Sequence, residues 1–177
     1  MKKIVTMMMI VSVLVISISI SAADNKAIIR ETSKGDITAI EKLILDGADI
    51  NYRDDKGVTP LMYAVLSNNS LVVEFLLKKG ADINKKDNLG LTALMYASDD
   101  NFLNMIGVLI SRGAEVNAVN TYGITALMFA AENGHTEAVN ILLKHGANIK
   151  LKNYSGLSAA DYALSKSHKE LYEILKN

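Results

Sequence analysis

The chain of 177 residues contains no cysteine and no tryptophan, and its single proline is Pro60. Without cysteine the protein has no disulfide, no thiolate ligand for zinc and no N-terminal thiol for a lipid anchor. An excess of charge is also missing, because 19 basic side chains are matched by 19 acidic ones. A chain without excess positive charge lacks the electrostatic footprint of a nucleic-acid binder. These absences argue against a disulfide scaffold, a cysteine zinc site and a nucleic-acid partner.

The N-terminal segment differs in character from the rest of the chain. Lys2 and Lys3 precede the apolar run IVTMMMIVSVLVISISI, and the small residues SAAD follow it. This order predicts a secretory signal over residues 1–23, cleaved after Ala23, and therefore an exported protein that is periplasmic or secreted. The alternative is an uncleaved membrane anchor, although the run is slightly short and diluted by serine compared with the roughly 20 apolar residues that span a bilayer. After cleavage no membrane contact is expected.

The remaining chain repeats itself every 33 residues. The phrases GVTPLMYA, GLTALMYA, GITALMFA and GLSAADYA begin at Gly57, Gly90, Gly123 and Gly156. A second phrase, DGADIN, KGADIN, RGAEVN and HGANIK, recurs at the same interval. A period of this length predicts a stack of structural units that bury one continuous core between neighbours.

Two short helices are predicted in each unit. The first begins after a hydroxyl residue that can accept a hydrogen bond from a free N–H of the first turn: Thr59, Thr92, Thr125 and Ser158. The second carries an apolar stripe, such as Val72, Phe75 and Leu76, and stops at a glycine. A small residue recurs in the first helix, which predicts a closely packed neighbour at that point: Ala64, Ala97, Ala130 and Ala163.

These phrases resemble the ankyrin repeat, whose pattern is G-x-T-P-L-H-x-A, a turn glycine, V-x-x-L-L and then G-A-D-x-N. The resemblance implies an all-α solenoid of helix-turn-helix units joined by β-turn or hairpin-like loops. The ankyrin-repeat domain would cover residues 24–177. It divides into a degenerate N-terminal capping repeat, three full repeats and a C-terminal capping repeat: 24–53, 54–86, 87–119, 120–152 and 153–177.

The sequence departs from the family pattern in two places. Met62, Met95 and Met128 stand where the family has histidine, so we expect the turns to be held in another way. Glu31 stands where the other units have alanine, which suits the solvent-facing edge of a capping unit. The last unit, which ends SHKELYEILKN, also looks like a cap with a polar outer side.

Catalytic and metal-binding chemistry finds no support in the residue pattern. His135 and His168 occupy one repeat position, where a structural role is expected, and His145 lies at a helix end. The cluster at Asp99 and Asp100 is too short for a calcium loop. The three repeated methionines are typical of core filling rather than of a soft metal site. No nucleophile motif or phosphate-binding loop is present, so we expect no enzyme activity, no cofactor and no metal.

Candidate binding residues vary from unit to unit while the framework stays constant. In the family, partners contact the loop tips and the exposed side of the first helix, which together form one concave face. Apolar or aromatic tips are the usual anchors of such interfaces. Mapped onto this chain, these positions are Asp55, Lys56, Val58, Leu66, Asn88, Leu89, Leu91, Asp99, Asp100, Thr121, Tyr122, Ile124, Glu132, Asn133 and Tyr154.

The resemblance therefore implies a non-catalytic module, monomeric, that binds another protein in the cell envelope or outside the cell. Two alternatives remain open at this point. The chain could be an inhibitor or protective chaperone of a co-exported enzyme, or a membrane-tethered structural spacer if the N-terminal segment is retained.

Overall fold

The computed structural model describes residues 25–176, so the predicted signal over residues 1–23 lies outside the described residues. Residues 25–34 are helical. The helices that follow are α2 (Ile37–Leu45), α3 (Pro60–Leu66), α4 (Ser70–Lys78), α5 (Ala93–Asp99), α6 (Leu103–Ser111), α7 (Ala126–Glu132), α8 (Thr136–Lys144), α9 (Ala159–Ser165) and α10 (Lys169–Leu175). The all-α solenoid predicted from the repeat is confirmed.

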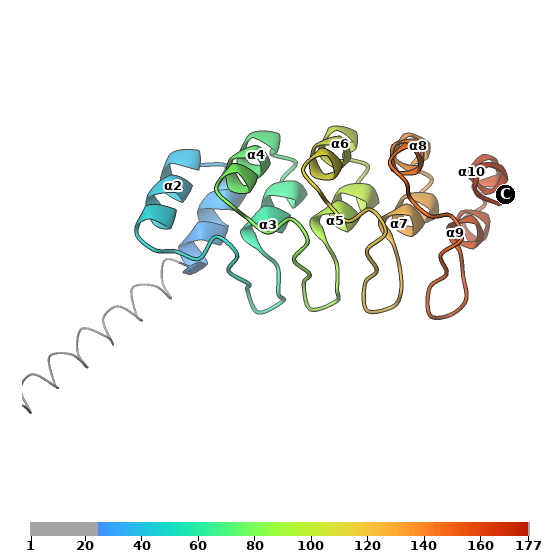
Figure 1. Cartoon of the computed structure of the whole chain (residues 1–177), viewed down its shortest axis with the longest axis horizontal. Coiled ribbons are helices and arrows are strands. Elements are labelled where there is room, and N and C mark those ends of the chain that lie inside the picture. The colour runs from blue at the N-terminus through green and yellow to red at the C-terminus, as the bar shows by residue number, and fades with distance from the viewer. Residues whose placement is uncertain (1–24, 177) are drawn as a thin grey trace, which may run out of the picture.

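The helices form two parallel rows (Figure 1). The inner row contains α3, α5, α7 and α9, and the outer row contains α2, α4, α6, α8 and α10. Hairpin-like loops project beyond the inner row, one for each unit from the second onward. Within residues 25–176 these loops form no extended strand, and their one bridge joins Lys152 to Ser158.

The predicted helix ends are present in the structure. The hydroxyls of Thr59, Thr92 and Thr125 each accept a hydrogen bond from the N–H three residues later. Asn68 and Asn101 end inner helices with φ of 48° and 56°, in the left-handed region that asparagine tolerates better than most residues. Ser167 does the same at the end of α9 with φ of 65°, which the sequence pattern did not indicate.

The core runs between the two rows along the whole stack. Ala64, Ala97, Ala130 and Ala163 are all 0% exposed, which agrees with the close neighbour predicted at this position. Met62, Met95 and Met128 are each 1% exposed and belong to the same apolar cluster. The methionine stripe is therefore core, as expected from its flexible, gap-filling side chain.

A different set of contacts replaces the histidine of the family pattern. The backbone N–H of Met62 donates to the Thr59 hydroxyl, and the Met62 sulfur lies 3.5 Å from the Thr59 nitrogen, within reach of its N–H. Sulfur is a weak acceptor, so this contact contributes little by itself. A carboxylate or amide at the start of each projecting loop supplies the stronger bonds.

The GADIN segments link successive units through an asparagine ladder of Asn51, Asn84 and Asn117. Their side-chain oxygens accept from the N–H of Asp82, Glu115 and Asn148, at 2.7, 2.9 and 2.8 Å respectively. The amide group of Asn117 also donates to the Gly146 carbonyl at 2.9 Å. Each asparagine thus forms hydrogen bonds with backbone groups of the following unit, which explains why asparagine recurs at this position.

The two terminal units differ in how well they match a polar cap. Glu31 is half-buried and forms ion pairs with Arg30 at 2.7 Å and Lys34 at 3.2 Å. The last unit exposes the charged side chains Lys169, Glu170 and Glu173, but its outer side is mixed and not polar throughout. Leu157, Leu164 and Ile174 are 44%, 49% and 40% exposed. Among residues 25–176, no helix is long and apolar enough to cross a bilayer.

Candidate functional site

Each projecting loop closes around one polar side chain, which is buried in three of the four loops and half-buried at Asp54. Asp87 is 7% exposed, and its Oδ1 accepts from the N–H of Leu89 at 2.9 Å and of Leu91 at 2.7 Å. Its Oδ2 accepts from the Tyr96 hydroxyl at 2.7 Å. Asp54, Asn120 and Asn153 close the other loops through the same two backbone N–H positions. The tips are therefore pre-organised by internal hydrogen bonds.

The aromatic partner of this side chain was missed by the sequence analysis. Tyr63, Tyr96 and Tyr162 each follow their aspartate or asparagine by nine residues and hydrogen bond to it. In the fourth unit the residue nine positions after Asn120 is Phe129, which has no hydroxyl. The signal was present in the sequence, because a polar residue and an aromatic one recur at this fixed separation.

The titration of these groups follows from burial and from their hydrogen bonds. Burial and the hydrogen bond to Asp87 raise the pKa of Tyr96 well above its usual range. Burial alone would raise the pKa of Asp54, but donation by Tyr63 and by the N–H groups of Val58 and Lys56 outweighs it and lowers the pKa. The Asp54 carboxylate is therefore favoured in its ionised form inside the loop.

Neighbouring loops are joined by their backbones. The N–H of Asn88 donates to the Lys56 carbonyl at 2.9 Å, that of Thr121 to Leu89 at 3.0 Å, and that of Tyr154 to Tyr122 at 3.0 Å. Because each loop is hydrogen bonded to the next, the tips form one continuous row.

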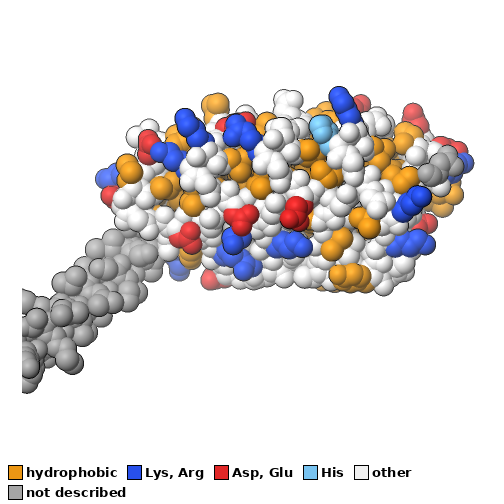
Figure 2. Space-filling model, in the orientation of Figure 1, with side chains coloured by type: hydrophobic (Ala, Val, Ile, Leu, Met, Phe, Trp, Pro, Cys, Tyr) orange, Lys and Arg blue, Asp and Glu red, His pale blue; other side chains and the backbone are white. Residues whose placement is uncertain are grey.

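Most of the predicted tip residues lie on the surface of this row. Leu89, Tyr122 and Tyr154 are 52%, 59% and 75% exposed, and Figure 2 shows hydrophobic side chains at the tips on the C-terminal half of this face. The other exposed tip residues are Asp55, Lys56, Asn88 and Thr121. The exposed apolar tips occur in consecutive, hydrogen-bonded loops, so they form a common strip.

Three of the predicted contact residues are not on the exposed row. Val58 is only 6% exposed because it follows the turn and points into the core. Leu91 and Ile124 occupy the same position in the next two units and are half-buried against the core. Burial contradicts the predicted contact at Val58, because the hairpin returns toward the inner helix one residue after the turn glycine. Leu91 and Ile124 keep part of their surface exposed, so a contact there stays a prediction.

Two exposed polar tip residues also have structural roles. The Asn88 amide donates to the Asp55 carbonyl at 2.9 Å, and the Thr121 hydroxyl donates to the Leu89 carbonyl at 2.8 Å. A substitution at either residue would therefore disturb the row of loops as well as any bound partner.

The helix-side candidates lie at the C-terminal ends of the inner helices. Leu66 is 41% exposed, and Asp99 and Asp100 are exposed at the end of α5. Asn133 donates to Asp99 Oδ1 at 2.7 Å. Glu132 is half-buried and pairs with Lys166 of the last unit at 3.4 Å. Asp99 and Asp100 form no ion pair with any described residue.

The Asp99 carboxylate is in an unfavourable setting for a negative charge. Partial burial beside the next unit raises its pKa, and the charges of Asp100 and Glu132 add to this, although the Asn133 hydrogen bond opposes it. The ionised side chain is therefore less favoured here than in water, and a cationic group placed beside it would relieve the cost.

The histidines are part of the framework. The His135 Nε2 lies 2.9 Å from the Asp99 carbonyl oxygen, and the His168 Nε2 lies 3.1 Å from that of Glu132. Each ring thus links the start of an outer helix to the end of the inner helix in the preceding unit. His145 lies at the C-terminal end of α8, as predicted. Residues 25–176 contain no group of three acidic or histidine side chains arranged to hold a metal.

The stacked helix pairs, the capped inner helices and the joined loops agree with a comparison to known families. A model of ankyrin repeats in three copies matches residues 27–120 and 108–177. The chain belongs to the ankyrin repeat family. Ankyrin repeats generally mediate interactions between proteins and are typically non-catalytic. No curated protein is significantly similar to this ankyrin-repeat chain.

Proposed function

We propose that this ankyrin-repeat protein is exported and binds another protein through a face formed by its loop tips and the ends of its inner helices. The observation that carries the proposal is the strip of Leu89, Tyr122 and Tyr154, held exposed on a pre-organised row of loops. Large apolar side chains on a rigid support are the usual anchors of protein interfaces, because little conformational entropy is lost on binding.

The acidic residues at the C-terminal end of α5 favour a partner with basic side chains. Asp99 and Asp100 lie on the inner helix of the unit that carries Leu89, and neither has a cationic partner among residues 25–176. A lysine or arginine on the partner would offset the repulsion around Asp99. Complementary charge of this kind mainly accelerates association and selects among partners.

Substitution of Tyr122 is the direct test of this binding face. We expect Tyr122→Ala to weaken partner binding by about 2 kcal/mol, roughly 30-fold in Kd, because a central apolar anchor is lost. Proteins captured from an envelope extract by the natural chain would be identified, and the affinity of the purified partner measured by calorimetry.

The matched control is Asn140→Lys, on the exposed side of the outer helix α8. We expect this variant to bind like the natural chain, and Asp99→Lys combined with Asp100→Lys to slow association. Full binding by Tyr122→Ala together with loss of binding in Asn140→Lys would place the interface on the outer helices and refute the proposal.

Export is tested separately at the N-terminus. We expect the protein recovered outside the cytoplasm to begin at Asp24, because SAAD follows the apolar run. N-terminal sequencing or intact mass measures this directly. A chain that begins at Met1 and stays in the membrane fraction would instead support the tethered spacer.

A further inference from the structure

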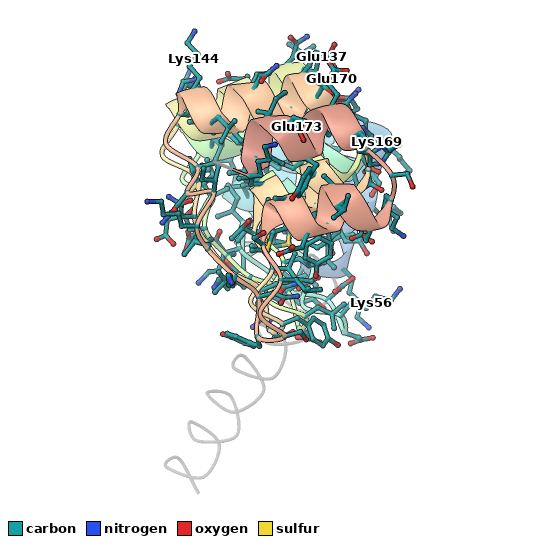
Figure 3. The ribbon with its side chains drawn as sticks, turned by 90° about the vertical axis from the view of Figure 1, so that its right-hand side faces the viewer. Lys56, Glu137, Lys144, Lys169, Glu170 and Glu173 are labelled. Carbon is teal, nitrogen blue, oxygen red and sulfur yellow. The ribbon has the colours of Figure 1, made fainter. Side chains whose placement is uncertain are left out.

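The outer side of the last unit is more apolar than a capping unit requires. A terminal repeat normally presents a polar outer face for solubility. Here Leu157, Leu164 and Ile174 are 40% to 49% exposed. Figure 3 looks onto this C-terminal end, with α9 and α10 toward the viewer and Glu173 on the α10 surface. The C-terminal end face is defined here as the outer surface of residues 149–176 without the Tyr154 side chain, which lies against Gly123 in the preceding loop.

The row of loops ends at this face, where one backbone carbonyl receives no hydrogen bond from a described residue. The carbonyls of Lys56, Leu89 and Tyr122 each receive an N–H from the following loop. The counterpart in the last loop is the Ser155 carbonyl, and no described residue donates to it. By analogy with the other repeats, a backbone N–H of an extended segment is the donor that would bind the Ser155 carbonyl.

The surroundings of the turn glycines also show that the last loop has no neighbour on its outer side. A Cβ added at Gly57, Gly90 or Gly123 would lie within 3.0 Å of an atom of the following loop. A Cβ added at Gly156 would meet nothing within 4 Å. The space that a neighbouring loop occupies at three positions is thus open at the fourth.

A hollow adjoins this open edge at the base of the same hairpin. Its volume is about 370 Å³, and its apolar lining includes Ile149, Ala160 and Leu175. Lys152 and Ser158, which also line it, pair across the hairpin immediately before and after residues 153–157. The open carbonyl and the hollow therefore belong to one continuous surface.

The charge of the hollow is predominantly positive. Lys150, Lys152 and Lys176 line it together with one carboxylate, Asp161. Asp161 is engaged by the N–H and hydroxyl of Ser158, at 2.8 and 2.7 Å. Lys176 pairs with Glu173 and lies 5.8 Å from the centre of the Tyr172 ring. Carboxylates placed at the rim would meet complementary charge.

A second copy of this chain cannot fill the edge with the same loop. The N–H groups of Tyr154 and Gly156 donate to the backbone of Tyr122 and Asn153. Those of Ser155 and Leu157 donate to the Asn153 side chain. Because the loop has no free donor between these residues, two such edges brought together would offer only acceptors to each other.

We propose that the C-terminal end face binds an extended segment of another protein, with an apolar side chain flanked by carboxylates. The segment donates a backbone N–H to the Ser155 carbonyl, as each following loop does to the one before it. Its apolar side chain enters the hollow, and carboxylates two residues away on either side reach the lysine rim, because alternate residues of an extended chain share one face. This surface contains neither Leu89 nor Tyr122, and it adjoins their strip only at the loop that carries Tyr154.

The test uses 15N-labelled protein and the acetylated, amidated peptide ESLSE, followed by NMR. We expect saturable shift changes confined to amides of residues 149–158 and 172–176. The peptides KSLSK and ESSSE, and ESLSE methylated on the leucine nitrogen, each remove one proposed contact and should bind more weakly.

Paired variants separate this proposal from the other binding face. Lys150→Glu combined with Lys152→Glu should weaken ESLSE binding by about fivefold, because two exposed charge contacts are reversed. Lys144→Glu, on the exposed end of α8, and Tyr122→Ala should leave it unchanged. The proposal fails if ESLSE gives no saturable shifts, if KSLSK binds equally well, or if the perturbed residues lie elsewhere. Concentration-dependent self-association that blocks the peptide would also overturn it, in favour of a second copy.

Discussion

Asp87→Ala is expected to lower the free energy of unfolding by about 3 kcal/mol, because it removes the acceptor of three hydrogen bonds in a buried position. The N–H groups of Leu89 and Leu91 and the hydroxyl of Tyr96 would all lose their partner. Leu89 and its neighbours would then no longer be held in one geometry. Urea denaturation followed by circular dichroism measures the loss.

Other units of the same chain supply the matched variants for this position. The fourth unit has Asn120 with Phe129, and Asn120 keeps both backbone bonds at 2.9 Å. Asp87→Asn combined with Tyr96→Phe copies that arrangement, so we expect it to cost only about 1 kcal/mol. A double variant as unstable as Asp87→Ala would show that the ionised carboxylate, rather than the loop closure, stabilises this turn.

The fold could be predicted from the sequence because the residues that recur in every repeat act on the backbone close to them in the chain. A hydroxyl cap such as Thr92 and a turn glycine such as Gly113 act within a few residues, so their meaning can be predicted without the tertiary structure. The stacking of units followed from the period and from the small residue at Ala97. These predictions depend on backbone geometry that every unit shares.

Predictions about the exposed face were less complete, because they depend on contacts between units. Val58 looked like a tip residue but is buried, since the return of the hairpin depends on the following inner helix. The bond from Asn88 to the Asp55 carbonyl joins residues 33 apart, and no local pattern indicates it. The exposed apolar residues of the last unit were also missed, because Leu157, Leu164 and Ile174 occupy positions that a following unit covers in the other repeats.

The largest difference between two chemically identical substitutions is expected at Gly90 and Gly156. Both glycines have φ near +80°, at +77° and +82°, where an L side chain is strained. Gly156→Ala should therefore cost about 1 kcal/mol from the backbone conformation alone. Gly90→Ala adds a Cβ only 2.7 Å from the Thr121 nitrogen and 3.0 Å from the Asn120 Cα, both backbone atoms that cannot rotate away.

We expect Gly90→Ala to lower the unfolding free energy by about 3 kcal/mol, because relief of the clash must separate two loops. The Thr121 N–H, which donates to the Leu89 carbonyl at 3.0 Å, should then exchange with solvent faster. In Gly156→Ala the N–H of Tyr154 should keep its protection. Chemical denaturation and hydrogen exchange of both variants measure the difference. Equal losses of stability, with Thr121 still protected in Gly90→Ala, would mean that the loops bend independently and that the row of tips is not a rigid support for a partner.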